Sequence, residues 1–175
     1  MKRYIKTSCV FANATKTIGS NYVPSKDEIL NGDATYGGLP VIYHPEIPSD
    51  ARNMDSEIWV SDKFFTYSHS GQQHILNHEV AHNLSDELMN EHLGDWNEFA
   101  SYFITEKQAP ETSQAYKNGK RTYWEGLYGD IGATSLSETT THAITEYLDN
   151  PNGLKRRSEE AYSIIDEFMT RRFNL

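Results

Sequence analysis

Residues 75–88 read ILNHEVAHNLSDEL, and this stretch decides the predicted fold. Its large apolar residues recur at every fourth position, as Leu76, Val80, Leu84 and Leu88. An apolar stripe with that spacing is typical of an amphipathic α-helix, because residues four apart lie on one helical face. We therefore predict a long helix through this stretch, with its apolar face packed against the rest of the protein.

The same helix carries the pattern His78-Glu79-Val80-Ala81-His82, an HExxH motif. Two histidines four residues apart can both reach one Zn²⁺ ion, at about 2.0–2.1 Å, from a single helical face. A glutamate next to the first histidine is then placed to take a proton from an attacking water. The motif predicts metal-dependent hydrolysis, with His78 and His82 as zinc ligands and Glu79 as general base.

The texture of the chain changes near residue 70. Before that point, short β-branched or aromatic runs predict strands at residues 3–6, 9–11, 39–43 and 57–60. Stretches rich in turn residues separate these runs, at 31–34, 37–38 and 45–53. After residue 70, apolar residues recur at the three- and four-residue spacing of an α-helix. Strands first and helices after predict an α+β fold, which we expect to be a single domain over residues 1–175.

Three further helices are predicted in the second half of the chain. They cover residues 96–104, the residues from Ser135 or Ser137 to an Asn-Pro-Asn-Gly turn at 150–153, and the residues after Ser158. Ser158 is a suitable N-cap, and Arg171 and Arg172 favour the C-terminal end of the last helix. Residues 135–138 also form a capping-box pattern, in which the Glu138 carboxylate would bind the backbone.

Charge and composition limit the partners of this chain. The 16 Lys+Arg against 25 Asp+Glu give a formal charge of −9 with no basic run, so nucleic acid is not an expected partner. No stretch approaches the roughly 20 apolar residues that a bilayer needs, so no membrane association is expected. The first residues are basic, but polar residues at 6–8 interrupt the apolar run of a signal peptide. We expect a protein that is cytoplasmic, or secreted without a recognisable signal peptide, and its oligomeric state stays open.

On its HExxH motif the sequence resembles the zincin metallopeptidases, most nearly the lethal-factor-like group that includes the Pro-Pro endopeptidases. The resemblance implies a zincin-like fold with a small N-terminal mixed sheet, an active-site helix and a helical C-terminal half. It also implies a peptide or protein substrate that binds along an edge strand. Residues 57–60 are either the strand in that role or a strand in the core of the sheet. Asp86, four residues after His82, matches an acidic position with a supporting role in the family.

A catalytic zinc site needs a third protein ligand, and the resemblance leaves three candidates. Glu138 matches the ligand glutamate on the second metal helix of the lethal-factor-like group, and Tyr128-Gly129 precedes it as a Tyr-Gly pair does in that family. His142 occupies the position of the family's next glutamate, and it is the ligand in an alternative alignment with Glu146 as its supporter. Glu98 lies in a stretch that resembles the second helix of thermolysin-like enzymes. We expect Glu138 to be the ligand.

The resemblance also implies a hydrogen-bond donor for the oxyanion that forms during hydrolysis. Tyr128 is expected in this role, because a phenol can donate a neutral hydrogen bond to developing negative charge. Tyr123 and Tyr116 lie nearby in the sequence and are alternatives.

These patterns predict a zinc-dependent endopeptidase with Glu79 and Tyr128 as catalytic residues and His78, His82 and Glu138 on the metal. One alternative is a non-catalytic zincin-like binding or structural protein, in which a fourth protein ligand would leave no position for water. Another is a hydrolase that acts on a non-peptide amide. The sequence does not identify the bond that is cleaved.

Overall fold

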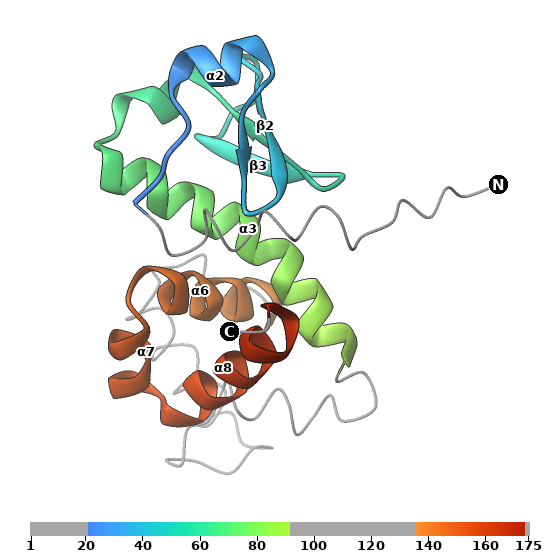
Figure 1. Ribbon diagram of the computed structural model, residues 1–175, viewed down its shortest axis with the longest axis vertical. Helices are drawn as coiled ribbons and strands as arrows, with labels where there is room; N and C mark the ends of the chain where they lie inside the picture. The colour runs from blue at the N-terminus through green and yellow to red at the C-terminus, as the bar shows by residue number, and fades with distance from the viewer. Residues whose placement is uncertain (1–20, 92–135, 174–175) are drawn as a thin grey trace, which may run out of the picture. The chain divides into compact units, whose positions relative to one another are not determined.

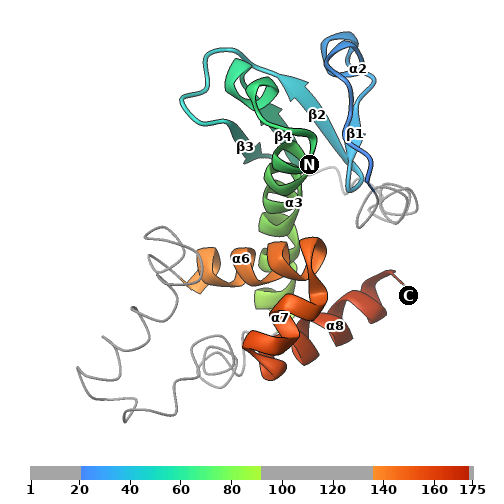
Figure 2. The same cartoon turned by 90° about the vertical axis from the view of Figure 1, so that its left-hand side faces the viewer.

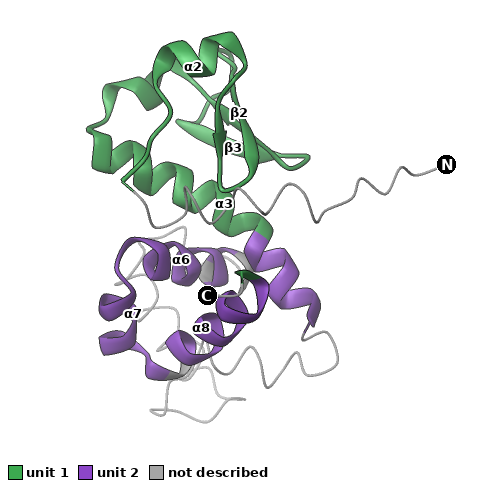
Figure 3. Ribbon diagram, viewed as in Figure 1, with its two compact units in different colours: residues 1–83, 173–175 green, residues 84–172 purple. Residues whose placement is uncertain are grey.

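The structure is a computed structural model, and it describes residues 21–91 and 136–173 (Figure 1). The chain divides into two compact units, residues 1–83 with 173–175 and residues 84–172 (Figure 3). The boundary between them falls inside one continuous helix, α3 (His69–Glu91).

The first unit contains a four-stranded sheet of order β1-β2-β4-β3. Its strands are β1 (Thr35–Tyr36), β2 (Leu39–Tyr43), β3 (Ala51–Met54) and β4 (Glu57–Val60). The central pair β2 and β4 is parallel, and the outer strands β1 and β3 are antiparallel to their neighbours, so the sheet is mixed. Side chains alternate across the sheet, and Val41, Ile58 and Val60 lie on its buried face.

The strand predictions at 39–43 and 57–60 are confirmed with the same bounds. Of the two readings of residues 57–60, the edge strand is wrong and the core strand is confirmed, because β4 pairs with β2 on one side and β3 on the other. Strand β3 was not predicted, since Ala51-Arg52-Asn53-Met54 has no β-branched or aromatic residue and lay inside a stretch assigned to turns. A two-residue turn at Asp55 and Ser56, both with positive φ, joins β3 to β4.

Two short helices accompany the sheet, and sequence patterns missed both. Helix α2 (Lys26–Asn31) begins at a capping box between Ser25 and Glu28 and ends at Gly32, which has a φ of 77°. The 3-10 helix η2 (Asp62–Thr66) follows β4 and buries Phe64. Both helices lie next to predicted turn or strand segments, and at five to six residues they are too short for a periodic apolar pattern.

Helix α3 confirms the helix predicted through the HExxH motif, and it is 23 residues long. The hydroxyl of Ser68 accepts the backbone N–H of Gly71 at 3.3 Å, which satisfies a donor that the first turn cannot pair internally. The four residues of the predicted stripe, Leu76, Val80, Leu84 and Leu88, are all buried. In Figure 1 the sheet lies beside the N-terminal half of this helix, and both belong to the first unit.

In its described residues the second unit contains the C-terminal half of α3 and the helices α6 (Leu136–Asp149), α7 (Pro151–Arg157) and α8 (Glu159–Phe173) (Figure 2). The predicted third and fourth helices are confirmed as α6 and α8, and the Ser158 hydroxyl accepts the Ala161 N–H at 3.2 Å. Helix α7 was not predicted. It starts directly after α6, because Pro151 suits a first helical position and the Asn150 side chain accepts the N–H of Gly153.

The core of the second unit is apolar and comes from all four helices. It consists of Leu84, Leu88, Ala143, Ile144, Leu148, Leu154, Ala161, Ile165, Phe168 and Met169. At the margin of this core the Tyr147 hydroxyl donates to Asp166 at 2.7 Å. Burial, and then this hydrogen bond, raise the pKa of Tyr147.

The observed fold is α+β, with a small mixed sheet followed by helices, as the sequence predicts. The strands expected at 3–6 and 9–11 and the helix expected at 96–104 lie outside the described residues. In the part of the chain that the structure describes, no helix is both long and apolar enough to cross a membrane.

Candidate metal centre

The two histidines of the motif lie one turn apart on α3, with their rings together. The ring centroids of His78 and His82 are 4.8 Å apart, and the ring planes meet at 81°. Both side chains are partly buried. Two imidazoles in this arrangement can present one nitrogen each to a common ion, as the spacing of four residues predicts.

Glu79 lies between the histidines in sequence and is buried, with 7% of its surface exposed. Carboxylates are rarely buried unless they are paired or bind a metal, since removing the charge from water is unfavourable. A buried glutamate that follows His78 in the sequence and shares a helical turn with two clustered imidazoles is therefore a candidate for chemistry. On its buried face α3 also carries Val80 and Ala81, which are apolar and limit the access of water to this turn.

The sheet holds the motif turn of α3 through two polar contacts in the first unit. The Tyr36 hydroxyl donates to Asn77 Oδ1 at 2.7 Å, and both residues are fully buried. At the opposite edge of the sheet, on β3, Asn53 Nδ2 donates to the backbone carbonyl of Glu79 at 2.8 Å. These contacts link β1 and β3 to neighbouring residues of one helical turn, and they fix the position of that turn against the sheet.

A third contact brings the turn between β1 and β2 against the motif. Gly37 has a φ of 58°, and a Cβ atom added there would lie 2.6 Å from Val80 Cγ2. No side chain fits at that distance without moving the helix or the strand. The Gly37-Gly38 pair, which the sequence marks only as a turn, therefore allows the sheet to approach α3 closely.

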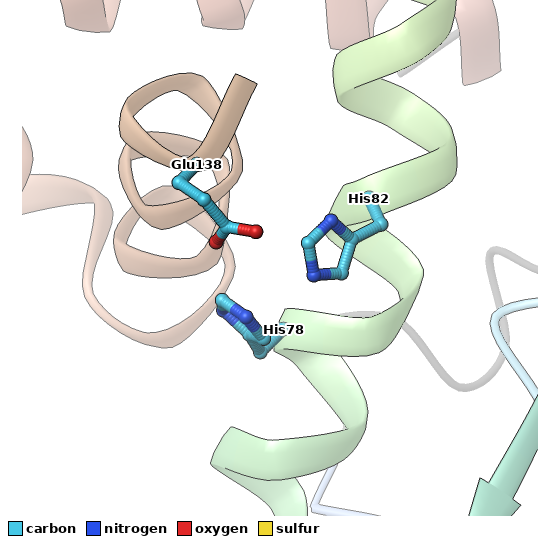
Figure 4. A group of neighbouring side chains, drawn as sticks. All are labelled: His78, His82 and Glu138. Carbon is cyan, nitrogen blue, oxygen red and sulfur yellow. The ribbon is translucent and has the colours of Figure 1, made fainter. Parts of the chain in front are cut away.

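The acidic candidate for the third ligand belongs to α6. His78, His82 and Glu138 each offer one ligand atom, and these atoms all lie within 4.8 Å of one another. Figure 4 shows the three side chains turned toward a common point, the histidines from α3 and the glutamate from α6. All three are partly buried.

The donor set fits zinc in kind, because two imidazoles and one carboxylate form a common set of three protein ligands at catalytic zinc sites. Three protein ligands leave a fourth position for water or substrate.

The other residues that the sequence suggests for the site do not belong to this group of three ligands. His142 is on α6 one turn after Glu138 and is partly buried, but the ligand group found among the described residues contains Glu138. Asp86 is exposed on α3. The structure does not test the roles expected of four other residues, because they lie outside the described residues. They are the alternative ligand Glu98 and the tyrosines Tyr116, Tyr123 and Tyr128.

Sequence patterns missed the residues that support the site. Asn53, Tyr36 and Asn77 are single polar residues without a spacing that marks them, and only the contacts between strand and helix reveal their role. Gly37 carried a signal as part of a glycine pair, but its meaning depends on Val80, which lies far along the chain. No protein-family model matches the chain, and comparisons with curated proteins and with solved structures gave no match either.

Proposed function

We propose that this protein is a zinc-dependent endopeptidase of the zincin type. The observation that carries the proposal is the HExxH turn of α3, which carries two clustered imidazoles and the buried residue Glu79. The grouping of Glu138 with the two histidines supports it, because it supplies a third ligand of the right chemistry. His78, His82 and Glu138 would hold the zinc ion.

The bound metal would supply a Lewis acid that polarises the scissile carbonyl and makes a coordinated water more acidic. Glu79 accepts a proton from the attacking water, whose oxygen forms the new bond to the carbonyl carbon. The carbon–nitrogen bond then breaks, and Glu79 returns the proton to the leaving amine. The products are a new carboxylate and a new amine, so Glu79 is regenerated in each cycle.

Tyr128 is proposed as the donor to the oxyanion, and this role rests on the resemblance to the lethal-factor-like group alone. A neutral phenol donates a hydrogen bond that is stronger to the charged oxyanion than to the neutral carbonyl of the bound substrate. The donor therefore stabilises the transition state more than the ground state. The substitution Tyr128→Phe would then lower kcat while zinc binding is unchanged.

A peptide substrate is proposed to pair with β3 rather than with β4. Among the described residues, β3 has a strand neighbour on one side only, and its Asn53 contacts the backbone of Glu79. Main-chain pairing along an open edge binds an extended segment of any sequence and leaves side-chain pockets to select among them. The substrate class is therefore an extended peptide or an unfolded segment of a protein.

The decisive experiment compares the wild type with Glu79→Gln in zinc content and in cleavage of a mixed peptide library read by mass spectrometry. Glutamine has the size of glutamate but cannot accept the proton, so we expect one zinc per chain and no cleavage above background. The substitution Glu87→Gln removes a carboxylate from the same helix outside the motif and is the matched control, with wild-type cleavage expected.

Three results would contradict the proposal. A wild type that binds no zinc after dialysis against the metal leaves the motif without its ion. A wild type that holds stoichiometric zinc and cuts nothing in the library favours the alternative of a structural zinc site. Cleavage that persists in Glu79→Gln would show that another group is the base.

A further inference from the structure

A side-chain hydrogen bond from β3 to the motif joins Asn53 to the backbone of Glu79. We propose that Asn53 is a positioning residue, which fixes the distance between the open edge strand and the general base. This inference rests on the proposed function, because it assigns the role of one residue in the same reaction.

The contact has the geometry of a strong neutral hydrogen bond. Asn53 Nδ2 lies 2.8 Å from the Glu79 carbonyl oxygen, and the pair is partly buried. A carbonyl oxygen has two lone pairs, so it can accept the side-chain donor in addition to the N–H of the next helical turn. The amide of Asn53 therefore binds the backbone of Glu79 without disturbing the helix.

The strand side of the contact is rigid. Asn53 pairs in register with Ile58 of β4, and Ile58 is fully buried. The strand that carries the amide is thus held by the core of the sheet, and the Glu79 end is held by the buried face of α3. Because both ends of this hydrogen bond are held in place, it sets the distance between β3 and the backbone of Glu79. A hydrogen bond between two mobile groups would not set such a distance.

Within the described ranges no strand pairs with β3 on the side away from β4, and the backbone of Asn53 faces that edge. The Ser61 N–H donates to the Asp50 carbonyl at 3.0 Å, which makes that pair a hydrogen-bonded one at the start of the β3–β4 ladder. Pairs alternate in an antiparallel ladder, so the N–H and C=O groups of Ala51 and Asn53 point away from β4. The residue whose side chain holds Glu79 therefore offers its main chain to an extended peptide.

This arrangement connects substrate and base through one residue. A peptide paired with Asn53 is held by the same residue that holds the backbone of Glu79, so the scissile bond and the carboxylate share one reference point. Errors of about 1 Å in such a distance lower rates by about a hundredfold, even when binding is unchanged. Removal of the Asn53 amide is therefore expected to act on kcat rather than on KM.

The test uses the full chain with its zinc and three variants at this position, Asn53→Asp, Asn53→Ala and Asn53→His. Aspartate has the shape of asparagine without the N–H donor, alanine removes the side chain without adding charge, and histidine offers a ring N–H at a similar distance from the backbone. Arg52→Ala is the matched control, because Arg52 is the neighbouring residue on β3 and is exposed. The measurements are zinc stoichiometry, kcat and KM on the library peptide that the wild type cuts best, and hydrogen exchange of residues 77–83.

We expect Asn53→Asp and Asn53→Ala to keep one zinc, to lower kcat about tenfold or more, and to change KM less than about twofold. Hydrogen exchange in residues 77–83 should accelerate in both, Asn53→His should recover part of kcat, and Arg52→Ala should match the wild type. The inference is overturned if the Asn53 variants keep wild-type kcat, if they lose zinc, or if Arg52→Ala lowers kcat equally.

The result also separates this inference from the proposed function. A wild type that holds zinc and cleaves nothing overturns the proposed function and the kinetic role of Asn53 with it. The hydrogen-exchange comparison still decides in that case whether Asn53 anchors the motif turn, because it needs no activity. Active wild type with unchanged exchange and kcat in Asn53→Asp overturns the positioning role alone.

Discussion

At the scale of single residues, two glycines of the first unit have the same sign of φ and different surroundings. Gly32 ends α2 with a φ of 77° and has no heavy atom within 4 Å of the position of an added Cβ. Gly37 has a φ of 58°, and its added Cβ would lie 2.6 Å from Val80 Cγ2. Both sites resist a side chain through backbone strain, but only Gly37 does so through a steric conflict with the HExxH turn.

We expect Gly32→Ala to lower the free energy of unfolding by about 1 kcal/mol, which is the cost of positive φ for an L-residue. Gly37→Ala should lower it by about 2–4 kcal/mol, because the overpacking against Val80 adds to the same backbone cost. Urea unfolding of the two variants measures both values. Equal losses at the two positions would mean that the β1–β2 turn does not approach α3 as closely as the structure shows.

At the scale of elements, α8 is joined to the C-terminal half of α3 by two ion pairs within the second unit. Arg172 binds Glu87 through two nitrogens, at 2.7 and 3.3 Å, and the two side chains are 26% and 36% exposed. Arg171 contacts Glu91 at 2.9 Å, with exposures of 56% and 42%. The first pair is forked and partly shielded, whereas the second is open to solvent.

Double-mutant cycles with alanine should therefore give a coupling energy of about 1 kcal/mol for Arg172–Glu87 and below about 0.5 kcal/mol for Arg171–Glu91. High salt should reduce the coupling of Arg171–Glu91 toward zero and that of Arg172–Glu87 by a smaller fraction, because screening acts most strongly on exposed pairs. Thermal or urea unfolding of the single and double variants provides the energies. A larger coupling for Arg171–Glu91 would contradict the shielding argument.

At the scale of the whole molecule, zinc is expected to stabilise the folded chain, because the unfolded chain does not hold the three ligands together. At a free zinc concentration a hundred times its Kd, the gain should be about 2.7 kcal/mol, and a chelator should remove it. Loss of a residue that only hydrogen-bonds to a metal ligand weakens metal binding by roughly 10–100-fold. Glu138→Gln removes a proposed ligand itself, so it should weaken zinc binding by more than that. Competition with a chromophoric chelator measures this affinity.

The same measurement on His142→Gln and Glu98→Gln distinguishes the three ligands that the sequence leaves open. Near wild-type affinity is expected for both if Glu138 is the ligand. A large loss in His142→Gln with little change in Glu138→Gln would assign the ligand to the next turn of α6 instead, with Glu146 as its supporter. A large loss in Glu98→Gln alone would favour the thermolysin-like arrangement.

Local patterns in the sequence determined the elements whose signal is contained in a few consecutive residues. The bounds of β2 and β4, the course of α3 through the HExxH motif, the apolar faces of α6 and α8 and the Ser158 cap of α8 all followed from periodicity and capping residues. Glu138 was also chosen from sequence, through its resemblance to a family motif. Its ligation stays a prediction, although the grouping with His78 and His82 supports it.

The tertiary structure alone decided what depends on residues that are distant in sequence. It put β4 inside the sheet and β3 at its edge, since strand order is set by pairing between segments and by which faces can be buried together. It also revealed the contacts of Asn53, Tyr36 and Gly37 with the motif turn. A contact between a strand and a distant helix produces no repeating pattern of residues within the strand, so the sequence alone does not reveal it.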